Sequence, residues 1–219
     1  MKKIVTLALM LIMTLSLAAC SSNNSGRQAG NGPAAAPQEK TSPTNTKAEI
    51  GNQTQLNAGG KKVLIAYFSR TGNTREIASQ IHANVGGDLF EIATVDPYPA
   101  NYNTTVDQAK REQETNLRPK LTARVQNMDA YGVIFLGFPN WWGTMPMAVF
   151  TFLEENNLSG KTIIPFVTHE GSGLGRSVND IRLLSPQSTI LNGLSIRGSD
   201  VKNAQNDVSA WLSKLGMKN

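Results

Sequence analysis

Hydrophobic and polar positions follow a repeating pattern from Lys61 onward. Residues 62–69 (KVLIAYFS) are nearly all apolar, as expected for a strand covered on both faces of a sheet. Next come Ile77, Ile81 and Val85, whose spacing of four residues predicts the buried stripe of a helix. A strand followed at once by a helix is the unit that builds parallel sheets.

The same unit recurs to the end of the chain. Helices are predicted from about Pro146 with Val149, Phe150 and Leu153 inward, near residues 177–184, and at the end with Val208, Trp211, Leu212 and Leu215 on one face. Further strands are predicted in DLFEIATV (88–95), YGVIFLGFP (131–139), KTIIPFVTH (161–169) and TILNGLSI (189–196). Five strands alternating with helices imply right-handed crossovers and an α/β fold with a doubly wound parallel sheet.

Two segments depart from this regular pattern. Pro165 lies inside the fourth predicted strand, where it removes a backbone donor, so we expect a bulge or a local break there. Residues 97–130 exceed an ordinary crossover and predict one helix plus an irregular excursion. Loops of this length are often functional.

The first 60 residues have a different composition. Residues 1–19 combine two lysines with a long apolar stretch and small residues, a pattern typical of a secretory signal peptide. They end in LAA before Cys20, and LAAC resembles the lipobox of bacterial lipoproteins, which implies cleavage before Cys20 and lipidation of its thiol. An ordinary buried thiol is the alternative. A lone cysteine excludes an intrachain disulfide or a multi-cysteine metal site.

Residues 21–60 consist mainly of Ser, Asn, Gly, Pro, Ala, Gln and Thr. Such a segment cannot bury enough apolar surface to offset its ordering entropy. The sequence therefore predicts a disordered linker over 20–60 and a folded domain over 61–219. We expect this domain to lie outside the cytoplasm, anchored by lipid to a bacterial membrane.

The net charge narrows the choice of partners. The formal charge of +5 becomes +3 when Lys2 and Lys3 leave with the signal peptide (5 − 2). The remaining Lys and Arg are scattered, without a basic block or interleaved aromatics, and this pattern argues against nucleic-acid binding.

Ligands of an open parallel sheet bind outside the carboxyl ends of its strands, where the strand order reverses. Three segments follow strands at that edge. They are SRTGNT (69–74, the first loop), FPNWWGTMP (138–146, the second loop) and THEGSGLGRS (168–177, the third loop). All three are rich in glycine, hydroxyls or tryptophan, so we expect the site there.

The first loop predicts a phosphate site. A helix N-terminus offers free amides and partial positive charge, Ser69, Thr71 and Thr74 add hydroxyls, and Gly72 lets the backbone approach closely. The lysine of a Walker loop and the spaced glycines of a Rossmann fingerprint are both absent from the loop. This favours a single terminal phosphate held by neutral donors. A well-capped helix without a ligand is the alternative.

The other two loops predict contacts to a flat ring. Trp141 and Trp142 could stack on a ring, or fill the core beneath the long excursion. Gly171, Gly173 and Gly175 would let amides approach a ring edge and stabilise negative charge there. A mobile connector is the alternative for this third loop.

A phosphate, a flat ring and a row of amides together describe a mononucleotide with a redox-active ring. The segments YFSRTGNT, PNWWGTMP and PFVTHEGSGLGRSVNDIRLL resemble the flavodoxin-like family, specifically its branch with an inserted helix after the second strand. The resemblance covers about residues 61–216. It implies a five-stranded sheet of order 2-1-3-4-5 and FMN as the cofactor.

The resemblance also implies a role for each loop. The phosphate would be bound by Ser69, Thr71, Gly72, Asn73 and Thr74, with Arg70 either assisting or pointing to solvent. One side of the isoalloxazine would be lined by Pro139, Asn140, Trp141, Trp142 and Gly143. Its pyrimidine edge would face Thr168, His169, Glu170, Gly171, Ser172 and Gly173.

The chain also departs from the electron-shuttling members of that family, which are usually acidic, cytoplasmic and equipped with a stacking tyrosine in the third loop. This domain is basic, carries an export signal and has His169 in that loop. A histidine titrating near neutrality could supply a proton during flavin reduction, or could be a passive hydrogen-bond donor. His82, on the first helix, is expected at the surface.

Three functions follow as hypotheses. The first is an FMN-dependent electron carrier at the outer face of the membrane, serving a redox partner protein or a quinone. The second is an FMN-dependent reductase in which a quinone or another flat acceptor stacks over the flavin beneath residues 97–130. The third is a lipoprotein that uses the fold for binding without redox chemistry. We expect no metal site.

Overall fold

A computed structural model of the chain describes residues 60–217. Three predictions lie outside the described residues: the signal peptide, the lipidation of Cys20 and the linker up to residue 59. No helix within residues 60–217 is both long and apolar enough to span a membrane.

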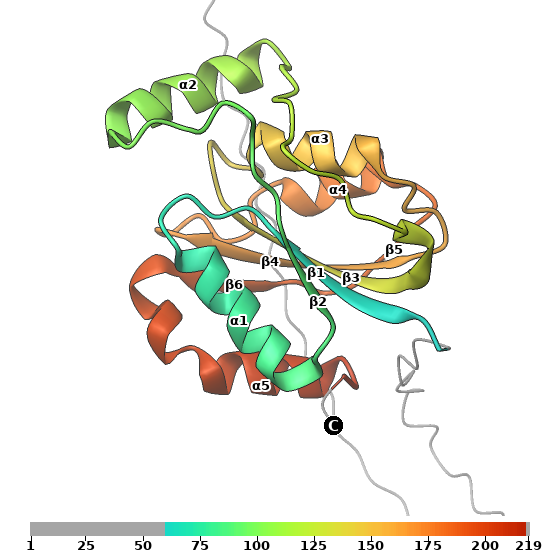
Figure 1. The fold of residues 1–219 in the computed structure, drawn as a ribbon. Coiled ribbons are helices and arrows are strands. Elements are labelled where there is room, and N and C mark those ends of the chain that lie inside the picture. Colours follow the sequence, from blue (N-terminus) through green and yellow to red (C-terminus); the bar gives the residue numbers. More distant parts are fainter. Residues whose placement is uncertain (1–59, 218–219) are drawn as a thin grey trace, which may run out of the picture. The chain divides into compact units, whose positions relative to one another are not determined.

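A parallel sheet runs through the centre of the described region (Figure 1). Its order is β2-β1-β3-β4-β5, and β6 continues beside β4. The strands are β1 (Lys62–Tyr67), β2 (Asp88–Glu91), β3 (Tyr131–Pro139), β4 (Thr162–His169), β5 (Thr189–Ile190) and β6 (Leu194–Arg197). This arrangement confirms the expected α/β fold and the expected strand order 2-1-3-4-5.

Helices cover both faces of the sheet, and each face has its own apolar core. One face carries α1 (Asn73–Val85) and α5 (Gln205–Lys214), and the other carries α3 (Met147–Glu155) and α4 (Ser177–Leu184) (Figure 1). Successive residues of a strand point to opposite faces. Ile65 therefore packs with α1 and α5, whereas Leu64 packs with the α3 side.

Two of the expected boundaries and faces differ in detail. The second strand ends at Glu91 instead of residue 95, because the chain then turns away and Thr94 pairs antiparallel with Leu121. In α3 the buried ring is Phe152, whereas Phe150 is only half-buried against the core.

The bulge or break expected within the fourth strand at Pro165 is wrong, because β4 is continuous there and the neighbouring strand is interrupted instead. β4 continues through Pro165, but the strand beside it is divided into β5 and β6. The amide of Leu191 donates to the carbonyl of Ile163, and because backbone groups alternate sides along a strand, Pro165 faces the same neighbour. Its missing N–H therefore lies opposite residues 191–193, where that neighbour is interrupted.

The long excursion contains one helix, as predicted. It is α2 (Tyr102–Glu114), which Asn101 caps by accepting a hydrogen bond from the amide of Thr104. Irregular chain follows up to a short 3-10 helix, η1 (Met128–Ala130). Figure 1 shows α2 standing beyond α3 on that side of the sheet. A second 3-10 helix, η2 (Gly198–Asn203), follows β6.

Candidate functional site

The first loop begins α1 at the carboxyl edge of the sheet and leaves amides free there. Gly72 has φ +94°, a left-handed conformation that glycine adopts without strain. The hydroxyl of Ser69 accepts hydrogen bonds from the amides of Gly72 and Arg75, both at 3.2 Å. The amides of Thr71 and Asn73 have no partner within residues 60–217. These free donors at a helix N-terminus favour an anion.

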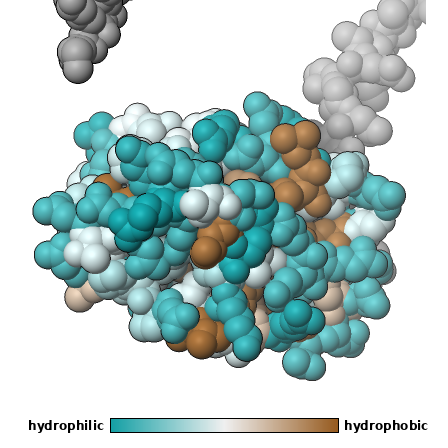
Figure 2. Space-filling view, turned by 90° about the horizontal axis from the view of Figure 1, so that it is seen from above, coloured by the Kyte–Doolittle hydropathy of each residue, from teal (hydrophilic) through white to brown (hydrophobic). Residues whose placement is uncertain are grey.

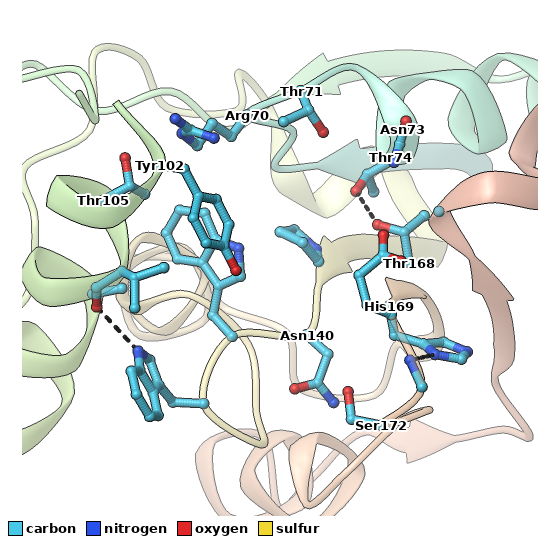
Figure 3. Close-up of a pocket in the computed structure, with 18 residues that line it drawn as sticks. Arg70, Thr71, Asn73, Thr74, Tyr102, Thr105, Asn140, Thr168, His169 and Ser172 are labelled. Carbon is cyan, nitrogen blue, oxygen red and sulfur yellow. Dashed lines mark hydrogen bonds between the residues drawn. The ribbon is translucent and has the colours of Figure 1, made fainter. Parts of the chain in front are cut away.

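Hydrogen bonds join the three loops to one another. The Oγ1 atoms of Thr74 and Thr168 are 2.9 Å apart in a buried hydrogen bond that links the first and third loops (Figure 3). The amide of Asn140 donates to the carbonyl of Thr168 at 2.8 Å, and its Nδ2 donates to the carbonyl of Gly173 at 2.8 Å. The second loop is therefore held against the third.

The second and third loops also approach closely at Gly175. The amide of Arg176 donates to the carbonyl of Gly143 at 2.9 Å. A Cβ at position 175 would collide with that carbonyl oxygen and lie 2.9 Å from Nδ2 of Asn140. Gly175 thus sets the distance between the loops, whereas the sequence had suggested that it brings amides towards a ligand.

The second loop turns sharply after β3. Trp141 and Thr144 exchange both backbone hydrogen bonds, at 2.8 and 3.2 Å. Trp142 and Gly143 between them have φ +52° and +82°, as in a type I′ turn. A bulky side chain at positive φ costs about 1–3 kcal/mol and is found mainly at functional sites.

The two tryptophans have different surroundings. Trp141 is half-buried and packs edge-on against Phe68 and Tyr98, with ring centroids 5.4 and 5.0 Å apart. Trp142 is 47% exposed, and its Nε1 donates to the carbonyl of Val106 in α2 at 3.1 Å. Trp142 thus links the second loop to α2, a role that the sequence did not predict.

Arg70 joins the first loop to the start of the excursion. Its guanidinium donates to the carbonyl of Pro99 at 3.0 and 3.3 Å and to that of Ala100 at 2.6 Å. It is therefore tied to the backbone before α2 and does not point to solvent. Its side chain lines the cavity described below.

A buried carboxylate secures α2 from its other end. Glu112 accepts hydrogen bonds from the hydroxyl of Tyr98 at 2.6 Å and from Nε2 of Gln108 at 2.8 Å. Burial, and then the hydrogen bond to Glu112, raise the pKa of Tyr98 far above its ordinary value.

In the third loop, His169 is engaged with its own backbone. Its Nδ1 accepts a hydrogen bond from the amide of Gly171 at 2.8 Å, so Nδ1 carries a lone pair and the neutral ring has its proton on Nε2. The amide of Gly171 is consequently used internally, whereas that of Ser172 has no partner within residues 60–217. His82 is exposed on α1, as expected.

A cavity of about 630 Å³ lies where the three loops meet α2 (Figure 3). The expected site residues that line it are Arg70, Thr71, Asn73, Thr74, Pro139, Asn140, Trp141, Trp142, Thr168, His169, Glu170, Gly171 and Ser172. Those that do not are Ser69, Gly72, Gly143 and Gly173. The surface in Figure 2 shows apolar residues as separate spots in a largely hydrophilic face.

Further lining residues were not predicted. They are Tyr102, Thr105, Val106 and Ala109 of α2, and Gly198 at the start of η2. The α2 residues recur at i, i+3, i+4 and i+7, a helical stripe that was readable in the sequence. No sequence pattern marks Gly198. Glycine is required there because a Cβ would collide with the Glu170 carboxylate and the Asn73 side chain, which are distant in sequence.

Comparison with known proteins identifies the family. Residues 62–215 match the sequence model of the family described as Flavodoxin. The chain belongs to the flavodoxin family. No curated protein matches this flavodoxin-family chain significantly.

Solved structures agree with the assignment to the flavodoxin family. A candidate flavoprotein from Bacteroides eggerthii is 33% identical, covering 72% of this chain and 99% of its own, with a TM-score of 0.64. Another from Bacteroides uniformis is 28% identical, covering 70% and 99%, also with a TM-score of 0.64. A Lactobacillus acidophilus flavoprotein crystallised in complex with FMN shares the fold at 22% identity and a TM-score of 0.55, covering 65% and 97%.

Proposed function

We propose that this chain binds FMN in the cavity and acts in electron transfer. The observation that carries the proposal is one cavity with a phosphate-type end and an aromatic end, built by cross-linked loops. Free amides and the Thr71 hydroxyl fit a single phosphate at the start of α1. A cavity of about 630 Å³ is within the usual range of small-molecule sites.

Each part of the cavity has a function in this proposal. Thr71, Asn73 and Thr74 would bind the phosphate, Trp141 would contact the ring, and Ser172 would donate its amide to a ring edge. FMN, when bound, supplies the redox chemistry, while the protein sets orientation and access. His169 would present Nε2–H as a hydrogen-bond donor at the rim of the site.

Flavin titration tests the proposal directly. Residues 61–219, which contain both apolar cores, should bind FMN more tightly than riboflavin, which has no phosphate. Thr71→Ala should weaken FMN by about tenfold or more, because a hydrogen bond to a charged group is lost, and should leave riboflavin almost unchanged. Thr122→Ala, outside the cavity, is the matched control. Equal affinity for both flavins would remove the phosphate site.

The α2 wall favours a second candidate, an FMN-dependent reductase. Val106 and Ala109 give the wall an apolar surface facing the loops, where a quinone or another flat acceptor could stack. Turnover of a soluble quinone with ping-pong kinetics would support this activity. Failure across a broad panel of acceptors would favour the carrier. A protein that binds no flavin would instead point to non-redox binding.

The sequence of residues 1–20 supports a location for this activity. A lipid on Cys20 would hold the domain at the outer face of a bacterial membrane, and residues 21–60 would let it reach membrane-bound donors or quinols. Cys20→Ser should move the protein from the membrane fraction to the soluble fraction. Continued membrane association of that variant would contradict the anchor.

A further inference from the structure

Tyr102 has a position that packing does not explain. It is the first residue of α2, it is 70% exposed, and it lines the cavity. Within residues 60–217 its hydroxyl has no hydrogen-bond partner. A large aromatic side chain that is neither buried nor hydrogen-bonded, yet lines a cavity, is typical of a ligand contact.

The backbone beneath Tyr102 is nevertheless fixed. Arg70 holds the carbonyls of Pro99 and Ala100, and Asn101 caps the first turn of α2. These bonds set the direction in which Tyr102 leaves the helix. Figure 3 shows its ring extending from the start of α2 into the cavity, facing Thr168 and Asn140 across the opening.

The opposite wall of the cavity offers a different chemistry. Its third loop contributes hydroxyls, backbone and Glu170, and the His169 ring is held by the amide of Gly171. The third loop therefore has no phenol to place against a ring. Trp141 also lines the cavity and would contact the ring, but part of its surface packs edge-on with Phe68 and Tyr98.

We infer that Tyr102 is the residue that stacks on the flat ring of the bound ligand, an isoalloxazine if the proposed function holds. The inference rests on that function. The phenol ring would then cover one face of the bound ring, while the amide of Ser172 in the third loop meets its edge. The excursion then supplies the aromatic face that the third loop lacks.

Binding of two flavins to three variants tests the inference. Tyr102→Ala should weaken FMN and riboflavin by the same factor, about two- to tenfold, because stacking involves the ring and not the phosphate. Tyr102→Phe should stay within about twofold of the wild-type protein, since the hydroxyl has no partner. Fluorescence of the bound flavin should rise in Tyr102→Ala, because an electron-rich phenol quenches it on contact.

Asn103→Ala is the matched control, because Asn103 is the next residue of α2, is exposed and does not line the cavity. Both alanine variants should keep the wild-type circular dichroism spectrum. Unchanged affinity and quenching in Tyr102→Ala would overturn the inference and leave the proposed function standing. So would a loss restricted to FMN. A wild-type protein that binds neither flavin would overturn the proposed function and the inference with it.

Discussion

The cavity has two walls of different construction. The wall at the sheet edge consists of loops that bond directly to one another, through Thr74–Thr168 and Asn140–Gly173. The other wall is α2, which is joined to the loops by long side chains such as Arg70 and Trp142. One wall is thus part of the folded core, and the other is attached to it.

This difference separates two tasks in a binding site. A rigid set of loops places phosphate and ring-edge donors, because each loop limits the movement of its neighbours. An attached helix can vary in sequence and position without disturbing the sheet, so it is suited to controlling what reaches the ring. We therefore expect substitutions in the loops to cost global stability, and substitutions at the α2 contacts to act locally.

The largest effect is expected where the loops touch. Gly175→Ala should lower the free energy of unfolding by about 2–4 kcal/mol, because φ +55° becomes strained and the Cβ collides with the Gly143 carbonyl. The measurement is urea denaturation.

Gly173→Ala provides a matched control for that change. Gly173 has φ +57°, but a Cβ there would meet no atom within 4 Å. It should cost only the backbone strain, about 1–2 kcal/mol. Equal losses in the two variants would show that the loops are not in close contact.

The difference between the loop wall and the α2 wall also decided which site residues could be predicted from the sequence. Thr71 and Asn140 follow buried strands and Thr168 lies at the end of one, and a parallel sheet brings such positions to one edge whatever the details of the loops. Tyr102 could not be placed in this way. Its position depends on where a helix within a long excursion comes to rest, and that is set by individual long-range bonds such as Arg70 to Ala100.

Even on the sheet, long-range partners decided some details. Pro165 alone indicated that a hydrogen bond would be missing, but not which strand would be interrupted. Trp142 was expected to contact a ring and does line the cavity, but its hydrogen bond to the carbonyl of Val106 depends on where α2 lies and could not be read from the second loop. Local pattern predicts elements, and partners distant in sequence decide how side chains are used.

A smaller effect is expected from the buried anchor of α2. Tyr98→Phe should cost about 1–2 kcal/mol near neutral pH, because Glu112 loses a hydrogen bond while buried. The folded-state pKa of Tyr98 is raised, so the contribution is complete below the unfolded value of about 10 and declines as pH rises above it.

Urea denaturation at about pH 8 and about pH 11 therefore gives a second test of the same bond. The difference between wild type and Tyr98→Phe should shrink at the higher pH. A difference that does not change with pH would mean that the bond to Glu112 does not set the protonation of Tyr98. No difference at either pH would mean that α2 separates before the sheet unfolds.

The smallest effect is expected at the exposed contact between Trp142 and α2. Trp142→Phe keeps an aromatic ring near Lys110 and the same backbone requirement at φ +52°, but removes the Nε1 donor to Val106. Hydrogen exchange of the α2 amides should rise about twofold, equivalent to roughly 0.5 kcal/mol, with global stability unchanged.

Trp142→Gly should have effects of opposite sign on the two walls, relieving the turn by about 1 kcal/mol while α2 exchanges faster still. If exchange in α2 stayed at the wild-type rate in both variants, the strained tryptophan would have no part in holding the helix, and other contacts such as those of Arg70 and Tyr98 would hold it.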